Sequence, residues 1–155
     1  MKLKIAVLPG DGIGPEVTNQ SIKVLKCIAN KYNHNIELSE GRVGAIAIDE
    51  YNDPYPDITH KLCMDSDAIL FGAIGDPKYD NDPKAKVRPE QGLLKMRKKL
   101  GLFANLRPTI IFESLLDMSP IKEERIKDTN ILFVRELTGG IYFGERGRKD
   151  NDNYA

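Results

Sequence analysis

The sequence predicts a layered α/β fold, in which strands and helices alternate along the chain. The first observation is an alternation of short apolar runs, rich in branched residues, with stretches of helical period. The second is that glycine and proline stand at most boundaries between these stretches. The third is the length, since 155 residues are enough to bury a real core.

The first predicted strand is the apolar run LKIAVL at 3–8, which ends at the turn PGDGIGP. A helix should follow this turn, because Pro15 suits the first helical position and Glu16 suits the positive end of a helix. Its apolar face is predicted from residues that recur at helical spacing, namely Ile22, Leu25, Ile28, Ala29 and Tyr32.

The middle of the chain continues the alternation. A second strand is predicted for NIELSEGRVG at 35–44, and a short helix for AIAIDEYN at 45–52. A further helix is predicted for PDITHKLCMDS at 56–66, and a third strand for DAILFGAIG at 67–75. The polar, proline-containing segment DPKYDNDPKAKVRP at 76–89 is predicted to be a loop.

A helix is predicted from near Glu90 to near Gly101. The segment LFANLRP that follows is predicted to be a strand that Pro108 ends, and a boundary between two lobes is predicted at 102–103. The domains would then be 1–102 and 103–155.

Two more extended segments are predicted near the C-terminal end. TNILFVREL at 129–137 is a predicted buried strand, apolar on both faces apart from Arg135 and Glu136. After a turn, GGIYFGE at 139–145 is predicted to be extended again.

Composition excludes several classes of partner. Lys plus Arg and Asp plus Glu both number 23, so the zero net charge gives no long-range attraction to nucleic acid or an anionic membrane. No apolar stretch approaches the ~20 residues of a membrane span. We expect a cytoplasmic protein with reduced, packed thiols, because Cys27 and Cys63 form no CxxC motif. Two histidines, His34 and His60, cannot build a His-rich metal site.

The turn GDGIGPE follows a strand and precedes a helix, which is typical of a dinucleotide-binding loop. Glu37 or Glu40 would be the ribose-binding acid of such a site. The match is incomplete, because Pro15 stands where the fingerprint's third glycine belongs. A tight turn that needs the backbone freedom of glycine explains the same residues, and both interpretations stay open here.

The stretch RPEQGLLKMRKKLGLFANLRP at 88–108 places an arginine in an apolar helix face. Glu90, Leu93, Leu94 and Arg97 stand at i, i+3, i+4 and i+7. Taken alone, Arg97 is best explained as a side chain whose stem covers the core and whose head reaches water.

Arg107 and Arg135 add to this pattern, because each lies in a strand with no clearly exposed face. Burying a guanidinium without an anionic partner is costly. Three arginines in apolar elements therefore indicate either three internal ion pairs or one shared anionic ligand. A dicarboxylate fits the second case, since guanidinium forks bind carboxylates in bidentate geometry. The pattern alone favours the ligand only slightly.

Three segments together resemble one family: VLPGDGIGPEV, RPEQGLLKMRKKLGLFANLRP and VRELTGGIYFGE. In this order and spacing they are similar to the N-terminal part of the 3-isopropylmalate dehydrogenases of leucine biosynthesis. The resemblance covers essentially the whole chain. This family and the isocitrate dehydrogenases are NAD- or NADP-dependent, metal-dependent enzymes that oxidise and decarboxylate malate-type 2-hydroxy acids. The resemblance implies their layered α/β fold, incomplete in this chain, which is not a true Rossmann fold.

The resemblance also implies roles for residues that match the family's motifs. Arg97, Arg107 and Arg135 would hold the malate carboxylates of the substrate. Tyr142 would be the catalytic tyrosine, which helps to protonate C3 after hydride transfer and loss of CO2, since a phenol is protonated at neutral pH. Without the resemblance, an aromatic residue of a strand would be the plainer interpretation of Tyr142.

The third substituent of the substrate is expected to meet Leu93 and Leu94, with Glu90 beside it and near the nicotinamide. Isocitrate dehydrogenases place a serine in this region to meet a carboxylate, so two leucines favour an isopropyl group. Packing of the helix explains the same two leucines, and this alternative stays open.

NAD is the cofactor that the resemblance implies. Ile13 would line the adenine side, and the segment 75–90 would flank the cofactor. The residues expected at NAD are Ile13, Gly75, Asp76, Pro77, Lys78 and Glu90. Many members have glycine at the position of Asp76. Because a carboxylate facing a pyrophosphate is unfavourable, we expect the Asp76 side chain to point away from the cofactor.

The resemblance places several parts of the family's active site beyond Ala155. They are the base lysine, the aspartates that bind Mg or Mn and the loop that grips the adenosine. Residues 1–102 would be part of a discontinuous cofactor-side domain, and 103–155 the start of a second domain whose arm interlocks the subunits of a homodimer. We therefore expect the 155 residues alone to lack dehydrogenase activity.

Three interpretations of function stay open at this point. The first is NAD-dependent oxidative decarboxylation of 3-isopropylmalate. The second is the same reaction on another malate-type acid, such as tartrate, homoisocitrate or isocitrate. The third is a non-catalytic product, either a gene remnant or a binding module, in which unpaired sheet edges would favour aggregation.

Overall fold

The computed structural model describes residues 1–80, 86–137 and 139–143, and at 141–142 it describes the backbone alone. The chain divides into two compact units, Met1–Leu100 and Gly101–Ala155. The assignment of the units as a cofactor-side domain and an arm domain stays a prediction.

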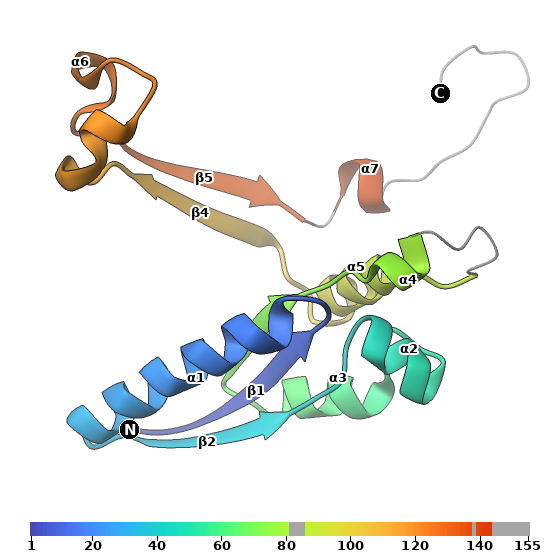
Figure 1. The fold of residues 1–155 in the computed structure, drawn as a ribbon. Coiled ribbons are helices and arrows are strands. Elements are labelled where there is room, and N and C mark those ends of the chain that lie inside the picture. Colours follow the sequence, from blue (N-terminus) through green and yellow to red (C-terminus); the bar gives the residue numbers. More distant parts are fainter. Residues whose placement is uncertain (81–85, 138, 144–155) are drawn as a thin grey trace, which may run out of the picture. The chain divides into compact units, whose positions relative to one another are not determined.

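Within the described residues, the first unit contains three strands and five helices (Figure 1). The strands are β1 (Lys2–Gly10), β2 (Asn35–Glu40) and β3 (Ala68–Ala73). The helices are α1 (Gly14–Lys31), α2 (Ala45–Tyr51), α3 (Asp57–Met64), α4 (Pro77–Asp80) and α5 (Pro89–Lys99). The predicted α/β class is therefore confirmed, as is the predicted alternation of elements as far as β3.

The three strands form a parallel sheet in the order β2-β1-β3, so β1 is the central strand. The first crossover passes through α1 and leads to β2 on one side of β1. The second passes through α2 and α3 and leads to β3 on the other side. Right-handed crossovers in opposite directions place their helices on opposite faces of the sheet.

The core lies on the face of the sheet that α3 and α5 cover. Ala6 and Leu8 of β1 are fully buried there, opposite Ile69 and Phe71 of β3. The other buried members of this cluster are Val43, Tyr55, Cys63 and Met96. Alternation along β3 directs Gly72 to the opposite face, toward α1. A Cβ on Gly72 would lie 2.7 Å from the hydroxyl oxygen of Thr18 in α1.

The local sequence explains where the helices begin and end. α1 has Pro15 in its first turn, as predicted. α2 ends at Asn52, whose φ of 55° is left-handed, and asparagine is one of the few residues other than glycine that adopt this conformation routinely. α5 ends just before Gly101, which has a φ of 64°. The predicted end of this helix near Gly101 is confirmed.

Two predictions for the first unit are wrong in part. Ile28 and Tyr32, predicted on the apolar face of α1, are 43% and 57% exposed. Within the described part of the chain β2 is an edge strand, and no further strand continues the sheet beneath that side of the helix. The segment 76–89, predicted to be a loop, contains the one-turn helix α4.

The second unit is built on a two-stranded antiparallel ribbon of β4 (Ala104–Ile110) and β5 (Asn130–Glu136). The connection between the strands contains the 3-10 helix η1 (Glu113–Met118) and the one-turn helix α6 (Glu123–Ile126). A short helix, α7 (Gly140–Phe143), follows β5.

Three predictions for this unit are wrong. Pro108 does not end β4, which continues to Ile110, because a two-stranded ribbon leaves outer edges where a missing N–H is tolerated. β5 is exposed along its whole length, with Phe133 55% and Val134 62% exposed, because the described residues place nothing over the ribbon. Residues 140–143 are helical and not extended, and they follow a left-handed turn at Gly140, whose φ is 65°.

In the part of the chain that the structure describes, no helix has both the length and the apolar composition needed to cross a bilayer. Both cysteines are free thiols. Cys63 is buried, whereas Cys27 on α1 is exposed, so the prediction of packed thiols holds for Cys63 only.

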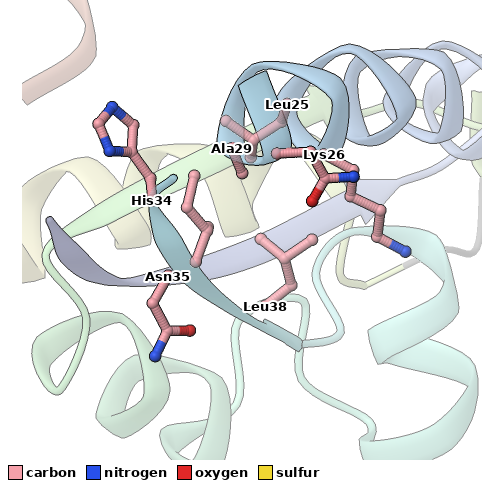
Figure 2. Close-up of a pocket in the computed structure, with 8 residues that line it drawn as sticks. Leu25, Lys26, Ala29, His34, Asn35 and Leu38 are labelled. Carbon is pink, nitrogen blue, oxygen red and sulfur yellow. The ribbon is translucent and has the colours of Figure 1, made fainter. Parts of the chain in front are cut away.

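A hollow of ≈ 250 Å³ lies between the last turns of α1 and β2 (Figure 2). Its lining residues are Leu25, Lys26, Ala29, Asn30, His34, Asn35, Ile36 and Leu38. Figure 2 shows the His34 and Asn35 side chains pointing in different directions. Polar groups that converge on one point mark a ligand site, and these do not converge.

Tyr55 is the largest fully buried side chain of the core, and its hydroxyl lies 3.3 Å from Nδ1 of His60. We expect Tyr55→Ala to lower the free energy of unfolding by about 3–5 kcal/mol, because it leaves a large cavity. Tyr55→Phe removes only the hydroxyl and should cost about 1 kcal/mol. Urea unfolding followed by circular dichroism measures both.

Tyr51, which is 46% exposed on α2, provides the matched control. Tyr51→Ala should change the free energy of unfolding by only about 0.5 kcal/mol. Equal effects of Tyr55→Ala and Tyr51→Ala would contradict the position of Tyr55 in the core.

Candidate functional site

The order β2-β1-β3 creates a topological switch point between β1 and β3, where the two crossovers leave in opposite directions. In open α/β sheets, ligands bind in the crevice outside the carboxyl ends of the strands at such a point. The loops that meet there are 11–13 after β1 and 74–76 after β3. Fold topology therefore places the candidate site at these loops.

Asp11 links three segments at this edge of the sheet. Its side chain is buried, and its Oδ2 accepts hydrogen bonds from the backbone N–H groups of Ala45 at 2.8 Å and Gly75 at 3.1 Å. Its Oδ1 accepts from the N–H of Ile46 at 3.2 Å. The backbone N–H of Asp11 itself donates to the carbonyl of Ala73 at 2.7 Å. One residue thus joins the first turn, the start of α2 and the loop after β3.

Glycines allow these segments to approach closely. A Cβ on Gly10 would lie 1.9 Å from the carbonyl oxygen of Ala73, and a Cβ on Gly14 would lie 2.1 Å from that of Pro9. At Gly44, which has a φ of 84°, a Cβ would lie 2.1 Å from Oδ2 of Asp11. A larger residue would displace neighbouring backbone at Gly10 and Gly14, and the Asp11 side chain at Gly44.

Two backbone donors near the start of α1 are used within this segment. The N–H of Gly14 donates to the carbonyl of Asp11 at 2.8 Å, and that of Val17 donates to the carbonyl of Ile13 at 3.1 Å. Pro15 has no N–H to offer. A dinucleotide fingerprint needs free N–H groups at this helix end for the pyrophosphate. The geometry therefore favours the tight-turn interpretation of GDGIGPE over a phosphate cradle.

Several residues expected at the cofactor lie at the switch point. Ile13 is 57% exposed beside Gly12, and a Cβ on Gly12 would lie 3.4 Å from the carbonyl oxygen of Gly75. Gly75 has a φ of 129°, and a Cβ on it would lie 3.4 Å from Oε1 of Glu90. The exposed apolar side chain of Ile13 suits an adenine, and the bare backbone at Gly75 suits a dinucleotide that lies close to it. The Glu90 carboxylate suits ribose hydroxyls.

Asp76 caps the short helix α4. Its Oδ1 accepts a hydrogen bond from the N–H of Lys78 at 2.9 Å, and its carbonyl accepts from Tyr79 at 2.9 Å. This turn is typical of Asp before a helix. It gives a local reason for a carboxylate at this position, and the direction of Asp76 relative to a bound cofactor stays a prediction.

Asp49 of α2 holds the exposed side of α4. Its Oδ1 accepts hydrogen bonds from Nζ of Lys78 and from the hydroxyl of Tyr79, both at 2.7 Å. The bonds from Lys78 and Tyr79 lower the pKa of Asp49. The same contacts raise the pKa of Lys78 and the pKa of Tyr79. Lys78, expected at the cofactor, is thus paired with a carboxylate of its own chain.

Arg88 connects α4 to the start of α5. Its guanidinium donates to the carbonyl of Tyr79 at 3.3 Å and lies 3.9 Å from Asp80. Its backbone N–H donates to Oε1 of Gln91 at 3.2 Å, which closes one half of a capping box. Pro89 in the first turn of α5 completes the helix start.

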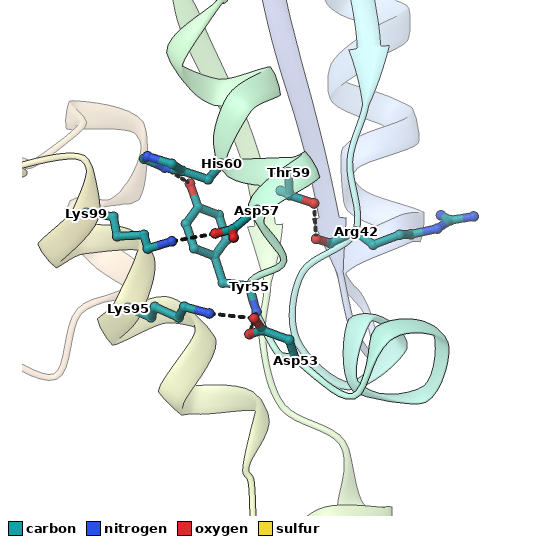
Figure 3. Close-up of polar contacts among 8 residues, drawn as sticks. All are labelled: Arg42, Asp53, Tyr55, Asp57, Thr59, His60, Lys95 and Lys99. Atoms are coloured by element: carbon teal, nitrogen blue, oxygen red, sulfur yellow. Dashed lines mark hydrogen bonds and ion pairs between the residues drawn. The ribbon is translucent and has the colours of Figure 1, made fainter.

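Two ion pairs hold α5 against the start of α3 and the segment just before it (Figure 3). Nζ of Lys95 lies 2.5 Å from Oδ2 of Asp53, and Nζ of Lys99 lies 2.6 Å from Oδ1 of Asp57. Gly92, one turn earlier on the same side of α5, leaves no room for a side chain, because a Cβ would lie 2.4 Å from the carbonyl oxygen of Pro54. These contacts determine which face of α5 remains for Glu90 and its neighbours.

The predicted substrate face of α5 is divided between two environments. Leu93 packs against the core cluster, while Glu90 is exposed. Leu94 and Arg97 are partly buried. Packing therefore accounts for part of the role of Leu93. The proposed contact of Leu93 and Leu94 with a substrate stays a prediction.

Arg107 and Arg135 lie on the ribbon of the second unit. The register places Asn105 opposite Arg135 and Arg107 opposite Phe133, so the two arginines are diagonal neighbours on one face. Nε of Arg107 donates to Oδ1 of Asn105 at 2.7 Å. Both arginines are exposed, so the prediction that they are buried is wrong. Whether they share one ligand or form separate ion pairs stays a prediction.

Tyr142 and the metal site are the remaining predictions. The backbone of Tyr142 belongs to α7, and its side chain lies outside the described residues. The residues after Gly144, expected to begin a dimerisation arm, lie outside them too. Within residues 1–80, 86–137 and 139–143, no three His, Cys, Asp or Glu side chains gather as a metal site. The aspartates that the resemblance assigns to Mg or Mn are expected beyond Ala155, so their role stays a prediction.

Sequence reasoning missed Asp11 and Asp49. Asp11 was part of the recognised turn, but its partners lie 34, 35 and 64 positions away, and no periodic pattern reports such contacts. Asp49 looks like an ordinary exposed helix residue. For Asp11, the sequence signal was a carboxylate in the glycine-rich turn GDGIGPE, at a position where the dinucleotide fingerprint fixes no residue.

Comparison with known proteins gives one consistent family. The sequence model of the isocitrate/isopropylmalate dehydrogenase family matches residues 4–155. The 3-isopropylmalate dehydrogenase of Bacteroides fragilis is 53% identical over 152 residues, which are 98% of this chain and 43% of that protein. The enzyme of the same name from Bacillus subtilis is 52% identical over 149 residues, 96% of this chain and 40% of that protein. The chain thus spans about two fifths of the length of these curated relatives.

Solved structures agree with this match. A β-decarboxylating dehydrogenase from Thermococcus kodakarensis is 31% identical with a TM-score of 0.61, over 88% of this chain and 34% of that chain. An isocitrate dehydrogenase from Methylococcus capsulatus is 26% identical with a TM-score of 0.68, over 98% of this chain and 40% of that chain.

The pair Lys95–Asp53 gives a pH-dependent prediction. Partial burial of Asp53 opposes ionisation, but the hydrogen bonds from Lys95 and from the backbone of Tyr55 outweigh it, so the pKa of Asp53 is lowered. A lowered folded-state pKa stabilises the fold above the unfolded value of about 3.9, and this stability is lost as the pH falls through the folded value. A double-mutant cycle with Asp53→Asn and Lys95→Met should give a coupling of about 0.5–1 kcal/mol at pH 7.

Urea unfolding at pH 7, 4 and 3 measures this coupling, which should decline between the two lower values. The pair Lys99–Asp57 is the control, because the Asp57 side chain is 87% exposed and its coupling should be smaller. A coupling at Asp53 that is unchanged down to pH 3 would contradict the assignment.

Proposed function

The chain belongs to the isocitrate/isopropylmalate dehydrogenase family, and we propose that it serves the NAD-dependent oxidative decarboxylation of 3-isopropylmalate. The observation that carries the proposal is identity of 53% and 52% to two proteins named 3-isopropylmalate dehydrogenase, over nearly the whole chain. The isocitrate dehydrogenase among the solved structures is 26% identical. The substrate, cofactor and assembly are all part of this proposal.

The substrate contacts that we propose follow from the family's motifs. Arg97, Arg107 and Arg135 would hold the carboxylates of the malate core. The diagonal placement of Arg107 and Arg135 on one face supports this role. Leu93 and Leu94 would meet the isopropyl group, supported by the absence of a polar group at both positions.

NAD would bind at the switch point between β1 and β3. Ile13 would line the adenine, Glu90 would lie near the nicotinamide ribose, and Gly75 would let the cofactor approach the backbone. Asp76, Pro77 and Lys78 would flank it. Support comes from the exposure of Ile13 and from the closeness of Gly75 to Glu90.

In this reaction C2 of the substrate loses a hydride, and its hydroxyl would lose a proton to the base lysine expected beyond Ala155. The ketone that forms allows the 3-carboxylate to leave as CO2. NAD, when bound, accepts the hydride. The arginine side chains orient both carboxylates so that C2 faces the cofactor. Tyr142 would return a proton to C3 as a general acid. The divalent metal that the resemblance implies would be held by aspartates expected beyond Ala155, and it would supply stabilisation of the negative charge that develops as CO2 leaves.

We also propose that the second unit functions in a homodimer. Two-stranded ribbons are marginal in water by themselves, and this one exposes Leu106 and Val134 by 61% and 62%. Apolar surface of this kind favours coverage by further protein. A cytoplasmic location is part of the same proposal, supported by the two free thiols.

A chimera tests the proposal directly. Residues 1–155 would be joined to the downstream part of the 3-isopropylmalate dehydrogenase of Bacillus subtilis at the matching position. We expect NADH formation from 3-isopropylmalate, with kcat/KM within about tenfold of the complete Bacillus enzyme. Isocitrate, homoisocitrate and tartrate should react at least about 100-fold more slowly, because the apolar pair cannot bind a polar substituent well.

The 155-residue chain alone is the control arm, and it should give no turnover. A folded chimera that prefers tartrate or homoisocitrate would show that the substrate is another malate-type acid of the same family. A folded chimera without activity on any of these acids would contradict the proposed function.

The arginine assignment has its own prediction. In the chimera, Arg107→Lys should lower kcat/KM for 3-isopropylmalate by about 10- to 100-fold, because lysine keeps the charge but loses the bidentate fork. Arg125→Lys, on the exposed helix α6, is the matched control and should change little. Steady-state kinetics with varied substrate measures both. Equal kcat/KM values for Arg107→Lys and Arg125→Lys would contradict the proposed contact between Arg107 and a substrate carboxylate.

A further inference from the structure

We infer that Asp11 is a positioning residue that sets the affinity of the site for its dinucleotide. The inference rests on the proposed function, because it concerns the cofactor site described above. Asp11 itself would not touch the cofactor. It would act by holding the exposed turn with Gly12 and Ile13 in a fixed relation to Gly75.

The buried position of Asp11 supports this role. It is 6% exposed, and its two carboxylate oxygens accept three backbone N–H bonds at 2.8, 3.2 and 3.1 Å. Bonds to a charged acceptor are stronger than neutral ones, and a buried N–H that loses its partner is costly. The N–H groups of Ala45, Ile46 and Gly75 are therefore held in fixed positions relative to Asp11.

The positions of the three donors show which segments Asp11 holds in place. Gly75 lies in the loop after β3, and its N–H bond to Oδ2 is shared with Ala45 at the start of α2. Asp49, one turn further along α2, accepts bonds from Lys78 and Tyr79. α2 thus links two carboxylates that hold the segment 75–79 at both of its ends.

The two carboxylates differ in strength. The Asp49 pair is exposed, with side chains 50% and 61% accessible, and exposed ion pairs contribute little. Asp11 is buried and bonded to backbone groups, which cannot rotate away. We therefore assign the placement of Gly75 to Asp11, and we expect Asp49 to have a smaller effect.

Three variants test the inference. Asp11→Ala removes both acceptor oxygens and with them all three hydrogen bonds. Asp11→Asn keeps the shape and one acceptor oxygen, so it should partly rescue the loss. Gly44→Ala leaves Asp11 unchanged but adds a Cβ where only 2.1 Å separates it from Oδ2. Tyr55→Phe, in the core and away from the turn, is the control for a general loss of stability.

The first readout is amide hydrogen exchange in the 155-residue chain without ligand. In Asp11→Ala the amides of Ala45, Ile46 and Gly75 should exchange at least about tenfold faster, while Asp11→Asn should be intermediate. The second readout is kinetics of the chimera. The KM for NAD should rise about tenfold in Asp11→Ala and about threefold in Asp11→Asn, with kcat and the KM for 3-isopropylmalate within about twofold.

The outcomes separate this inference from the proposed function. An active unchanged chimera whose Asp11 and Gly44 variants keep the KM for NAD would overturn the inference alone. So would a rise in KM that Tyr55→Phe reproduces, because loss of stability would then explain it. An unchanged chimera that neither binds NAD nor turns over would overturn both. If Asp11→Ala does not fold, Asp11→Asn and Gly44→Ala decide by the same criteria.

Discussion

The close approach of the end of β1 to the end of β3 is the constraint on which the first unit depends. Gly10, Gly14 and Gly72 have no space for a Cβ, since each would lie within 2.2 Å of a carbonyl oxygen. Only glycine permits this contact. The approach brings the Asp11 N–H to the carbonyl of Ala73 and buries its side chain below the turn. Strand pairing, the turn and the candidate site therefore share one steric origin.

Buried contacts contribute more to the structure of this site than exposed contacts do. The bonds to Asp11 are formed by backbone N–H groups out of water, where an unpaired donor is costly. The pairs Lys78–Asp49 and Lys99–Asp57 involve exposed charges that water and salt screen. The switch point is therefore determined mainly by backbone groups, and exposed side chains adjust the segment around it. This arrangement suits a site where a ligand must lie against bare backbone.

The sequence predicted most of the first unit because each element carries its own signal. Its strands are short branched runs, and its boundaries have Pro15, Asn52 and Gly101, whose backbone preferences act locally. The same reasoning wrongly predicted that β5 is buried. An apolar run indicates that a segment favours burial, but it does not show which surface covers it. It also missed Asp11, whose partners are set by tertiary contacts over 34 to 64 positions. Family resemblance supplied Arg107 and Arg135, while only the register showed that they share a face.

The two units differ in how far they are self-sufficient. The first buries a core on one face of its sheet, with Ala6, Leu8 and Tyr55 fully enclosed. The ribbon of the second unit exposes apolar side chains along both strands, so its stability requires additional protein surface. The register of β4 and β5 nevertheless fixes Arg107 and Arg135 relative to each other, because a slip by one residue would send one of them to the opposite face. Under the proposed role of Arg107 and Arg135, the surface that covers the ribbon would leave their face open to a small anion and would occupy the other face and the edges.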